Sequence, residues 1–296
     1  MRVRFDYPVA MKIPKELQSL IEDGVIDEVV RSLKSGKEAA VYVVRVKSDL
    51  RCAKVYKNMS QRSFQQRAQY QEGRQVRGSR QARAIGKRTR FGRGEEEAAW
   101  KNTEVDALYQ LMAAGVRVPT PYGYSDGVLV MELVVDADGR SAPGLGDVEF
   151  TSDDALHYHA RLVRQVQLML CAGLIHGDLS EYNVLAAADG PVIIDLPQAV
   201  NAAGNNGART MLLRDVNNLT DTLSRFAPEL RETRFGEELW HLFERGELHV
   251  DSVLTGTFVD DEHAADVDGV QQVIADARDE DERRRRGREE AEALPE

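Results

Sequence analysis

The chain has few of the features that mark membrane, secreted or disulfide-linked proteins. It contains only two cysteines, Cys52 and Cys171, which lie in apolar stretches far apart in the sequence. Such a pair is more typical of reduced core thiols than of a disulfide or a metal site. No apolar run approaches the length of a membrane span, and no signal peptide opens the chain. The sequence therefore predicts a cytoplasmic protein without a membrane partner.

Charged residues are plentiful but unevenly distributed. The net charge is −10, yet residues 61–94 hold ten Arg or Lys and one acid, Glu72, so this segment carries +9 and the remainder −19. With little aliphatic content, the segment cannot bury enough apolar surface to fold alone. One interpretation is docking on nucleic acid. The other is a solvated loop that packs against its own acidic chain or is phosphorylated at Ser63, Ser79 or Thr89.

The most informative motif is the stretch HGDLSEYN at residues 176–183. Two apolar runs follow it, and the turn between them predicts a hairpin that brings Asn183 and Asp195 to one end, beside Asp178. In kinase-fold phosphotransferases, the first Asp orients or deprotonates the acceptor, while the Asn and the later Asp hold magnesium on the nucleotide phosphates. Any one of these residues alone would be typical of a solvated loop. The joint pattern favours phosphoryl transfer.

The amino-terminal half contains a candidate phosphate-binding turn. It begins with Ser35, Gly36 and Lys37 and leads into a β-branched strand that includes Val41, and the next strand carries Lys54. Backbone N–H groups of a Gly-bearing turn can face phosphate oxygens. Lys54 projects from one face of its strand as an ammonium suited to the α- and β-phosphates. The alternative is an ordinary strand lysine that points to water.

Four segments together resemble the RIO family of atypical serine/threonine protein kinases. They are SGKEAAVY from residue 35, AKVYK from residue 53, the HGDLSEYN loop and IDLPQAV from residue 194. The resemblance covers residues 12–230, and the LSEYN portion is the part most specific to that family.

The resemblance implies an α+β, two-lobed protein-kinase-like fold. It would have a small antiparallel-sheet N-lobe and a compact helical C-lobe without the usual large substrate-binding subdomain. We expect a helical extension over residues 1–33 and an N-lobe over 34–133 with a basic, flexible insertion at 58–98. The C-lobe would cover 134–255, followed by a charged tail over 256–296.

The resemblance also implies roles for individual residues. Lys54 matches the lysine that anchors ATP, and Asp178 matches the catalytic aspartate. Asn183 and Asp195 match the magnesium ligands, and the Asp195 position can carry a phosphoryl group during ATP hydrolysis. Asp215, in a later predicted helix, is expected to hold the backbone of the catalytic loop.

Two further positions complete the predicted nucleotide site. Glu104, in the first half of a predicted helix, is the candidate partner of Lys54; the alternative is a surface glutamate. The hinge that would hold the adenine edge through backbone groups is expected at Met131, Glu132 and Leu133.

These features predict an enzyme that transfers the γ-phosphate of ATP to a protein serine, its own included, or hydrolyses ATP, with Mg²⁺ or Mn²⁺ as cofactor. Ribosomal RNA or a pre-ribosomal particle would be the partner of the basic residues 62–93. One alternative is a small-molecule phosphotransferase of the aminoglycoside or choline kinase type, which shares the acidic pattern. The short stretch between Leu133 and His176 leaves little room for its larger helical lobe. The other alternative is an ATPase assembly factor that binds RNA.

Overall fold

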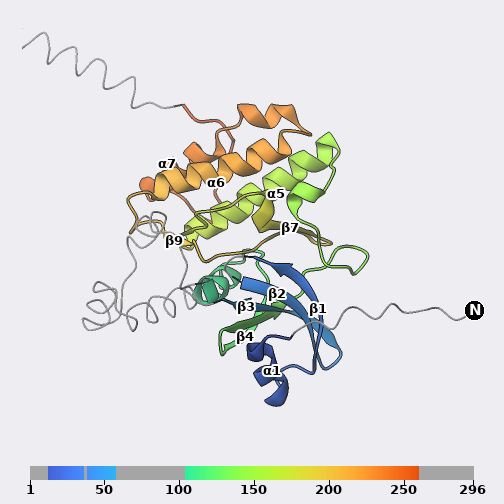
Figure 1. Ribbon diagram of the computed structural model, residues 1–296. Coiled ribbons are helices and arrows are strands. Elements are labelled where there is room, and N and C mark those ends of the chain that lie inside the picture. Colours follow the sequence, from blue (N-terminus) through green and yellow to red (C-terminus); the bar gives the residue numbers. More distant parts are fainter. Residues whose placement is uncertain (1–12, 37–38, 58–103, 260–296) are drawn as a thin grey trace, which may run out of the picture. The chain divides into compact units, whose positions relative to one another are not determined.

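Figure 1 shows the computed structural model of the chain, which describes residues 13–36, 39–57 and 104–259. The described elements belong to one structural unit that ends at Gly256. Lys37, the basic residues 62–93 and the tail from residue 260 lie outside these ranges, so the predictions for them stay predictions. No helix in the described ranges is both long and apolar enough to cross a bilayer.

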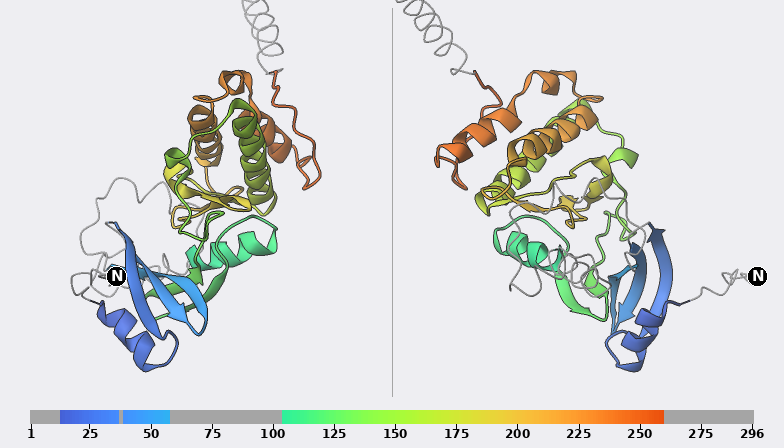
Figure 2. Two further views of the ribbon diagram at one scale, coloured as in Figure 1. Left: turned by 90° about the vertical axis from the view of Figure 1, so that its right-hand side faces the viewer. Right: turned by 60° about the vertical axis from the view of Figure 1, so that its left-hand side comes forward.

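The N-lobe is built on a five-stranded antiparallel sheet in the order β1-β2-β3-β5-β4. Its strands are β1 (Glu28–Ser35), β2 (Ala39–Val46), β3 (Asp49–Tyr56), β4 (Pro121–Ser125) and β5 (Val128–Glu132). Helix α1 (Lys15–Glu22) lies against this sheet, as the two views of Figure 2 show.

The predicted helical extension over residues 1–33 needs one correction. It contains the helix α1, but β1 begins at Glu28, so the sheet starts before residue 34. Most β1 side chains are exposed, and the strand therefore lacks the apolar alternation by which strands are recognised in a sequence. Pairing with β2 along most of its length holds it in place.

The two faces of the sheet belong to different cores because side chains alternate along a strand. On one face, Val44, Val55 and Val130 are buried against Leu17 and Leu20 of α1. On the inner face, Val41, Lys54 and Leu129 lie opposite one another on β2, β3 and β5. Leu129, with Ala39 and Tyr56, belongs to the large core that continues into the C-lobe. The inner face is thus the side of the sheet that meets the catalytic half of the molecule.

The C-lobe consists mainly of three helices, α5 (Ser152–Cys171), α6 (Ala208–Leu223) and α7 (Phe235–Glu244). Shorter elements connect them: the 3-10 turns η1 (Leu145–Asp147), η2 (Glu181–Asn183) and η3 (Pro228–Glu232), and the paired strands β6 (Leu174–Ile175) and β9 (Val200–Asn201). Both cysteines are free, as predicted, and Cys52 on β3 is buried. Burial raises the pKa of the Cys52 thiol to about 12, which makes it an unreactive core residue.

Residues 104–113 form a helix that packs into the C-lobe core. Its Leu108 and Leu111 are buried in the same cluster as Leu162 of α5 and Leu219 of α6. The Gln110 side chain also donates a hydrogen bond to the Ala172 carbonyl, which follows α5, at 2.7 Å. The helix that carries Glu104 is therefore attached to the C-lobe as well as to the sheet.

The predicted hairpin is present as β7 (Val184–Ala187) and β8 (Gly190–Ile193). In Figure 1 it lies between the helices of the C-lobe and the sheet of the N-lobe. Its turn favours a glycine, because Gly190 has φ +120°, a conformation that residues with a side chain rarely adopt. The two strands join Asn183, just before β7, to Asp195, just after β8.

Candidate active site

Lys54 stands at the centre of a charged cluster between the two lobes. Its Nζ lies 2.6 Å from Glu104 Oε1 and 2.6 Å from Asp195 Oδ1. The Lys54 side chain is 10% exposed and the Glu104 side chain 3%, whereas that of Asp195 is 45% exposed. The structure thus brings the predicted Lys54–Glu104 pair together with Asp195. Because both side chains are buried, Lys54 is not a water-facing lysine and Glu104 is not a surface glutamate.

Electrostatics keep Lys54 and Asp195 charged. Burial works against the Lys54 ammonium, but Glu104 and Asp195 together raise its pKa above the ordinary value. Burial likewise opposes ionisation of Asp195, but the Lys54 ammonium outweighs it and lowers the pKa of that carboxyl. Lys54 is therefore a permanent cation, and Asp195 offers a charged and solvent-accessible oxygen beside it.

Tyr56 is a site residue that the sequence reasoning missed. Its hydroxyl donates to Glu104 Oε2 at 2.5 Å, on the carboxylate oxygen that Lys54 does not contact. Burial first and the Glu104 charge second raise the pKa of Tyr56, so its hydroxyl remains a donor. The signal was available, because Tyr56 lies two residues after Lys54 on the same strand and so shares its face.

The catalytic loop is held from α6 by the carboxylate of Asp215. Gly177 N–H donates to Asp215 Oδ2 at 2.7 Å, and Leu179 N–H donates to Oδ1 at 3.0 Å. Two neighbours of Asp215 add further bonds, since Arg214 donates to the Gly177 carbonyl and Asn218 to the Leu179 carbonyl. These contacts match the supporting role expected for Asp215, and they fix the backbone on both sides of Asp178.

His176 connects this loop to the strand end that carries Asp195. A carbonyl oxygen can only accept, so His176 Nε2 donates to the Ile194 carbonyl at 3.0 Å, and Nδ1 is free to accept from Asp178 N–H at 3.3 Å. The His176 ring thus bonds to both the loop and the strand end. Its role in the structure is to align Asp178 with the hairpin.

Asp178, Asn183 and Asp195 converge at the open end of the hairpin. Asn183 Nδ2 donates to the Asp178 carbonyl at 2.8 Å, and Ile194 N–H donates to the Asn183 carbonyl at 3.0 Å. The side chain of Asp178 is exposed at the mouth of the site. Asp195 has φ +67°, a conformation that is uncommon for a residue other than glycine and that aims its carboxylate toward Lys54.

These residues fit a magnesium ion that is shared with a phosphate ligand. Because the Asn183 side chain donates its Nδ2 to the Asp178 carbonyl, its Oδ1 atom is left for a metal, as is the exposed Asp195 carboxylate. Both are hard oxygen ligands of the kind that Mg²⁺ prefers. Among the described residues, no group of three His, Cys, Asp or Glu side chains is placed to hold a metal. An ion here would take its other ligands from water and phosphate.

The predicted phosphate turn lies between the end of β1 and the start of β2. Gly36 N–H donates to the Ala39 carbonyl at 2.9 Å, which closes the turn. The Lys57 ammonium donates to the Gly36 carbonyl at 2.7 Å and to Ser35 Oγ at 3.1 Å, so the residue that follows β3 braces the base of the turn. Ser35 and Gly36 are both exposed, as a ligand-facing turn requires.

The predicted hinge is only partly available to a ligand. Met131 is half-buried and packs against the large core, so it lines the inner side of the sheet. The Glu132 N–H already donates to the Thr120 carbonyl at 2.9 Å, and its carboxylate binds Arg117. The Glu132 N–H is thus already bonded, and the expectation that backbone groups around Glu132 and Leu133 hold the adenine edge stays a prediction.

Comparison with known proteins settles the family. Residues 40–235 match the model of the RIO domain, which is well over half of the chain. The chain belongs to the RIO family. The Lys54 cluster and the catalytic loop described above both lie within these matched residues.

Individual relatives agree with this assignment. The RIO-type serine/threonine-protein kinase Rio1 of Haloferax volcanii is 34% identical over 211 residues, which cover 71% of this chain and 68% of that protein. The serine/threonine-protein kinase RIO1 of Homo sapiens is 28% identical over 227 residues, which cover 74% of this chain and 37% of that protein. The chain thus spans little more than a third of its human relative.

A solved structure supports the fold. The Rio2 kinase of Chaetomium thermophilum, as its complex with ADP/Mg²⁺ and phosphoaspartate, matches with a TM-score of 0.50 and 21% identity, covering 71% of this chain and 59% of that one. The predicted RIO family and the predicted two-lobed, kinase-like α+β fold are confirmed. The names of the relatives agree with the predicted class of enzyme, a RIO-type serine/threonine protein kinase, rather than with a small-molecule phosphotransferase.

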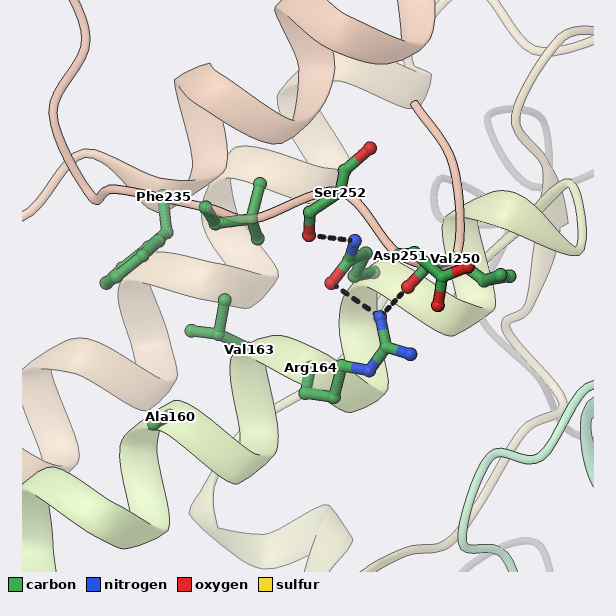
Figure 3. A pocket seen from close by; sticks show the side chains of 9 residues that line it. Ala160, Val163, Arg164, Phe235, Val250, Asp251 and Ser252 are labelled. Atoms are coloured by element: carbon green, nitrogen blue, oxygen red, sulfur yellow. Dashed lines mark hydrogen bonds between the residues drawn. The ribbon is translucent and has the colours of Figure 1, made fainter. Parts of the chain in front are cut away.

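The C-lobe of this chain also has a hollow of about 430 Å³ between α5, α7 and the segment 250–254 (Figure 3). Val163 and Phe235 form part of its apolar wall. Arg164 donates to the Val250 carbonyl, and Gln167 donates to the Ser252 carbonyl at 2.9 Å. These bonds hold the segment 250–254 against α5, and the residues that line the hollow include none of the predicted site residues.

Proposed function

We propose that this RIO-family protein transfers the γ-phosphate of ATP to a serine hydroxyl of a protein, its own chain included. The observation that carries the proposal is the position of Lys54 Nζ, 2.6 Å from both Glu104 and Asp195. A buried ammonium fixed by one carboxylate and adjacent to a second, exposed one suits a triphosphate with its metal. The ADP and Mg²⁺ in the Rio2 complex support the same ligand here.

Each residue of the cluster has a distinct task in this proposal. Lys54 binds phosphate oxygens, and Glu104 keeps its ammonium at a fixed point. Asn183 and Asp195 would hold Mg²⁺, or Mn²⁺ in its place, which offsets the negative charge of the phosphates. Catalysis of this kind depends on positioning and on electrostatic stabilisation more than on covalent steps.

Asp178 acts on the acceptor. Its exposed carboxylate accepts a hydrogen bond from the serine hydroxyl and so aligns the oxygen for in-line attack on the γ-phosphorus. The new bond joins the serine oxygen to phosphorus, the bond to ADP breaks, and the hydroxyl proton passes to Asp178. When water replaces the serine, the same arrangement yields ADP and inorganic phosphate. The phosphoaspartate of the Rio2 complex suggests Asp195 as a transient phosphoryl acceptor in such hydrolysis.

The test uses labelled ATP with the full chain, alone and with cell extract, and follows label on protein, on small molecules and as free phosphate. Asp178→Ala should lower transfer by about 10³-fold while ADP binding stays within about twofold of the wild type. Asp195→Ala should weaken Mg²⁺-ADP binding itself. Arg245→Gln, at an exposed ion pair beyond α7, is the matched control. Transfer that survives Asp178→Ala would refute the assigned role.

The composition of residues 62–93 supports a second candidate, an ATPase assembly factor that grips RNA through this segment. The segment holds ten basic residues, and RNA affinity based on them would fall steeply with salt. Slow single-turnover ATP hydrolysis without protein phosphorylation would favour this candidate. Steady label transfer to serine, with no salt-sensitive RNA binding, would favour the kinase.

A further inference from the structure

A second cation bridges the lobes behind the active site. Arg117 lies between the helix of residues 104–113 and β4, and its guanidinium contacts two carboxylates. Its NH1 and NH2 atoms donate to the two oxygens of Glu132 at 2.9 and 2.6 Å, and its Nε donates to Asp189 Oδ2 at 2.9 Å. Glu132 ends β5, whereas Asp189 lies in the turn between β7 and β8.

The backbone of Arg117 is held in the same region. Its N–H donates to Gln165 Oε1 on α5 at 2.7 Å, and its carbonyl accepts from the N–H of Ile193 on β8 at 3.0 Å. These two bonds do not involve the guanidinium. A substitution of the side chain should therefore remove the bridge while its backbone stays attached to the C-lobe.

The two arms of the bridge differ in strength. The Glu132 arm is a bidentate Arg–carboxylate pair, the stronger class of ion pair, and the two side chains are 28% and 25% exposed. Thr120 adds bonds to Glu132 Oε2 from its N–H at 3.1 Å and its hydroxyl at 3.2 Å. The Asp189 side chain is 61% exposed, so water screens the other arm.

The bridge joins two parts of the nucleotide site that lie in different lobes. The strand β5 leads into the hinge, where the Leu133 backbone is the candidate for holding adenine. The β7–β8 hairpin carries Asn183 and Asp195 at its other end, where Mg²⁺ would bind. Arg117 thus connects the strand that leads to the adenine end with the hairpin that carries the metal end.

We propose that Arg117 is a positioning residue that couples nucleotide binding at the hinge to Mg²⁺ binding at the hairpin. The inference rests on the proposed function, since it assumes a Mg²⁺-nucleotide ligand. A ligand at either place fixes the hinge and the hairpin relative to each other, so each ligand strengthens the binding of the other. The coupling is the ratio of the ADP dissociation constants measured with EDTA and with Mg²⁺.

The test measures this ratio by calorimetry on the full chain, together with the melting temperature. Arg117→Met should lower the ratio by about tenfold, because the stronger arm is lost with the weaker one. Asp189→Asn, which removes the exposed arm alone, should lower it by about threefold. Arg117→Lys keeps the charge without the fork and should fall between these values. Arg245→Gln should leave the ratio unchanged.

The outcomes separate positioning from general stability. If Arg117 serves stability alone, Arg117→Met will raise both dissociation constants by one factor and leave the ratio at its wild-type value, which would overturn the inference. Adding Asp189→Asn to Arg117→Met should cause no further fall, because both changes break the same connection. If the two changes lowered the ratio of dissociation constants additively, the result would contradict the inference. Wild-type protein that binds no Mg²⁺-ADP would overturn the proposed function as well.

Discussion

The β7–β8 hairpin is held by a cation at each end, and the two cations differ in kind. At the open end, Lys54 lies between Glu104, on the N-lobe side, and Asp195. At the turn end, Arg117 lies between a carboxylate of the N-lobe and Asp189. The same arrangement, one cation and two acids from two lobes, thus occurs twice on one small element.

The difference between the two cations indicates a division of tasks. Lys54 makes both contacts through one nitrogen, which can exchange a carboxylate oxygen for a phosphate oxygen with little movement. Arg117 makes its contacts through three nitrogens of a rigid plane, so its partners must keep their relative orientation. The open end is therefore suited to changing partners during a reaction, and the turn end to maintaining geometry.

The largest expected effect comes from breaking the open end. Lys54→Met should lower phosphoryl transfer by about 10³-fold or more, because the charge on the phosphates loses its fixed partner. It should also lower the free energy of unfolding by about 3 kcal/mol, because buried Glu104 is left unpaired. Labelled-phosphate transfer and urea unfolding measure the two effects. The double variant Lys54→Met/Glu104→Gln should recover stability but not activity, and recovery of both would contradict the assignment.

The charges of Lys54 and Arg117 do not change in acid. A pH series therefore reports on a different group of the site, the carboxyl of Asp215. Burial raises the pKa of Asp215 to about 6, although His176 and two backbone N–H groups oppose the shift. The folded state then holds the proton more tightly than the unfolded state. Stability contributed by Asp215 is thus complete below about pH 4 and is lost as the pH rises through about 6.

The variant Asp215→Asn, which does not titrate, tests this pH dependence. The stability of the wild type relative to the variant should fall by about 2 kcal/mol between about pH 4 and pH 7. Urea unfolding at several pH values measures it. A constant difference across the range would show that Asp215 titrates normally.

An intermediate effect should come from the hydroxyl groups that orient the two N-lobe carboxylates. Tyr56→Phe removes the donor to Glu104 Oε2 and should cost about 1.5 kcal/mol of stability, with a severalfold loss of kcat. Thr120→Val is the matched change at the turn end. It should cost less, because the Thr120 N–H still donates to Glu132. Equal losses in both variants, measured by unfolding and by steady-state kinetics, would remove this distinction between the ends.

The smallest effect should come from a cation with one exposed partner. Arg45 pairs with Glu28 on the surface of the sheet at 2.7 Å, and the two side chains are 41% and 56% exposed. Arg45→Gln should change the free energy of unfolding by less than about 0.5 kcal/mol and leave transfer unchanged. A larger loss would mean that ion pairs on this sheet contribute more than solvent screening permits.

The sequence predicted the open end of the hairpin better than its turn end. The catalytic loop, two apolar strands and a terminal Asp follow one another within twenty residues, so local patterns were enough to place Asn183 beside Asp195. The Lys54–Glu104 pair followed from the family resemblance and from one strand and one helix with clear periodicity. The network of Arg117 joins three segments that no periodic pattern relates, and only the folded chain brings them together.

Two other features of the fold could not be predicted from the sequence, and each has a physical reason. The strand β1 was missed because most of its side chains face water, so its identity comes from backbone pairing rather than from apolar alternation. Backbone groups around Glu132 and Leu133 are predicted to hold the adenine edge, and the sequence does not reveal that the Glu132 N–H is bonded to Thr120. Whether a particular backbone group is free for a ligand depends on its neighbours in the folded chain, which the sequence does not order in space.

The packing of residues 104–113 has a consequence for how such a protein can be controlled. Many switches work by swinging a helix away from its lysine, which breaks the ion pair and silences the site. Here that movement would pull Leu108 and Leu111 out of a core shared with α5, at roughly 1.5–3 kcal/mol for each side chain. The state in which the helix has moved away from Lys54 would be costly to populate. Inhibitors that bind only that state would therefore bind a small fraction of the protein. Control through the supply of ligand or access to the acceptor would avoid this cost.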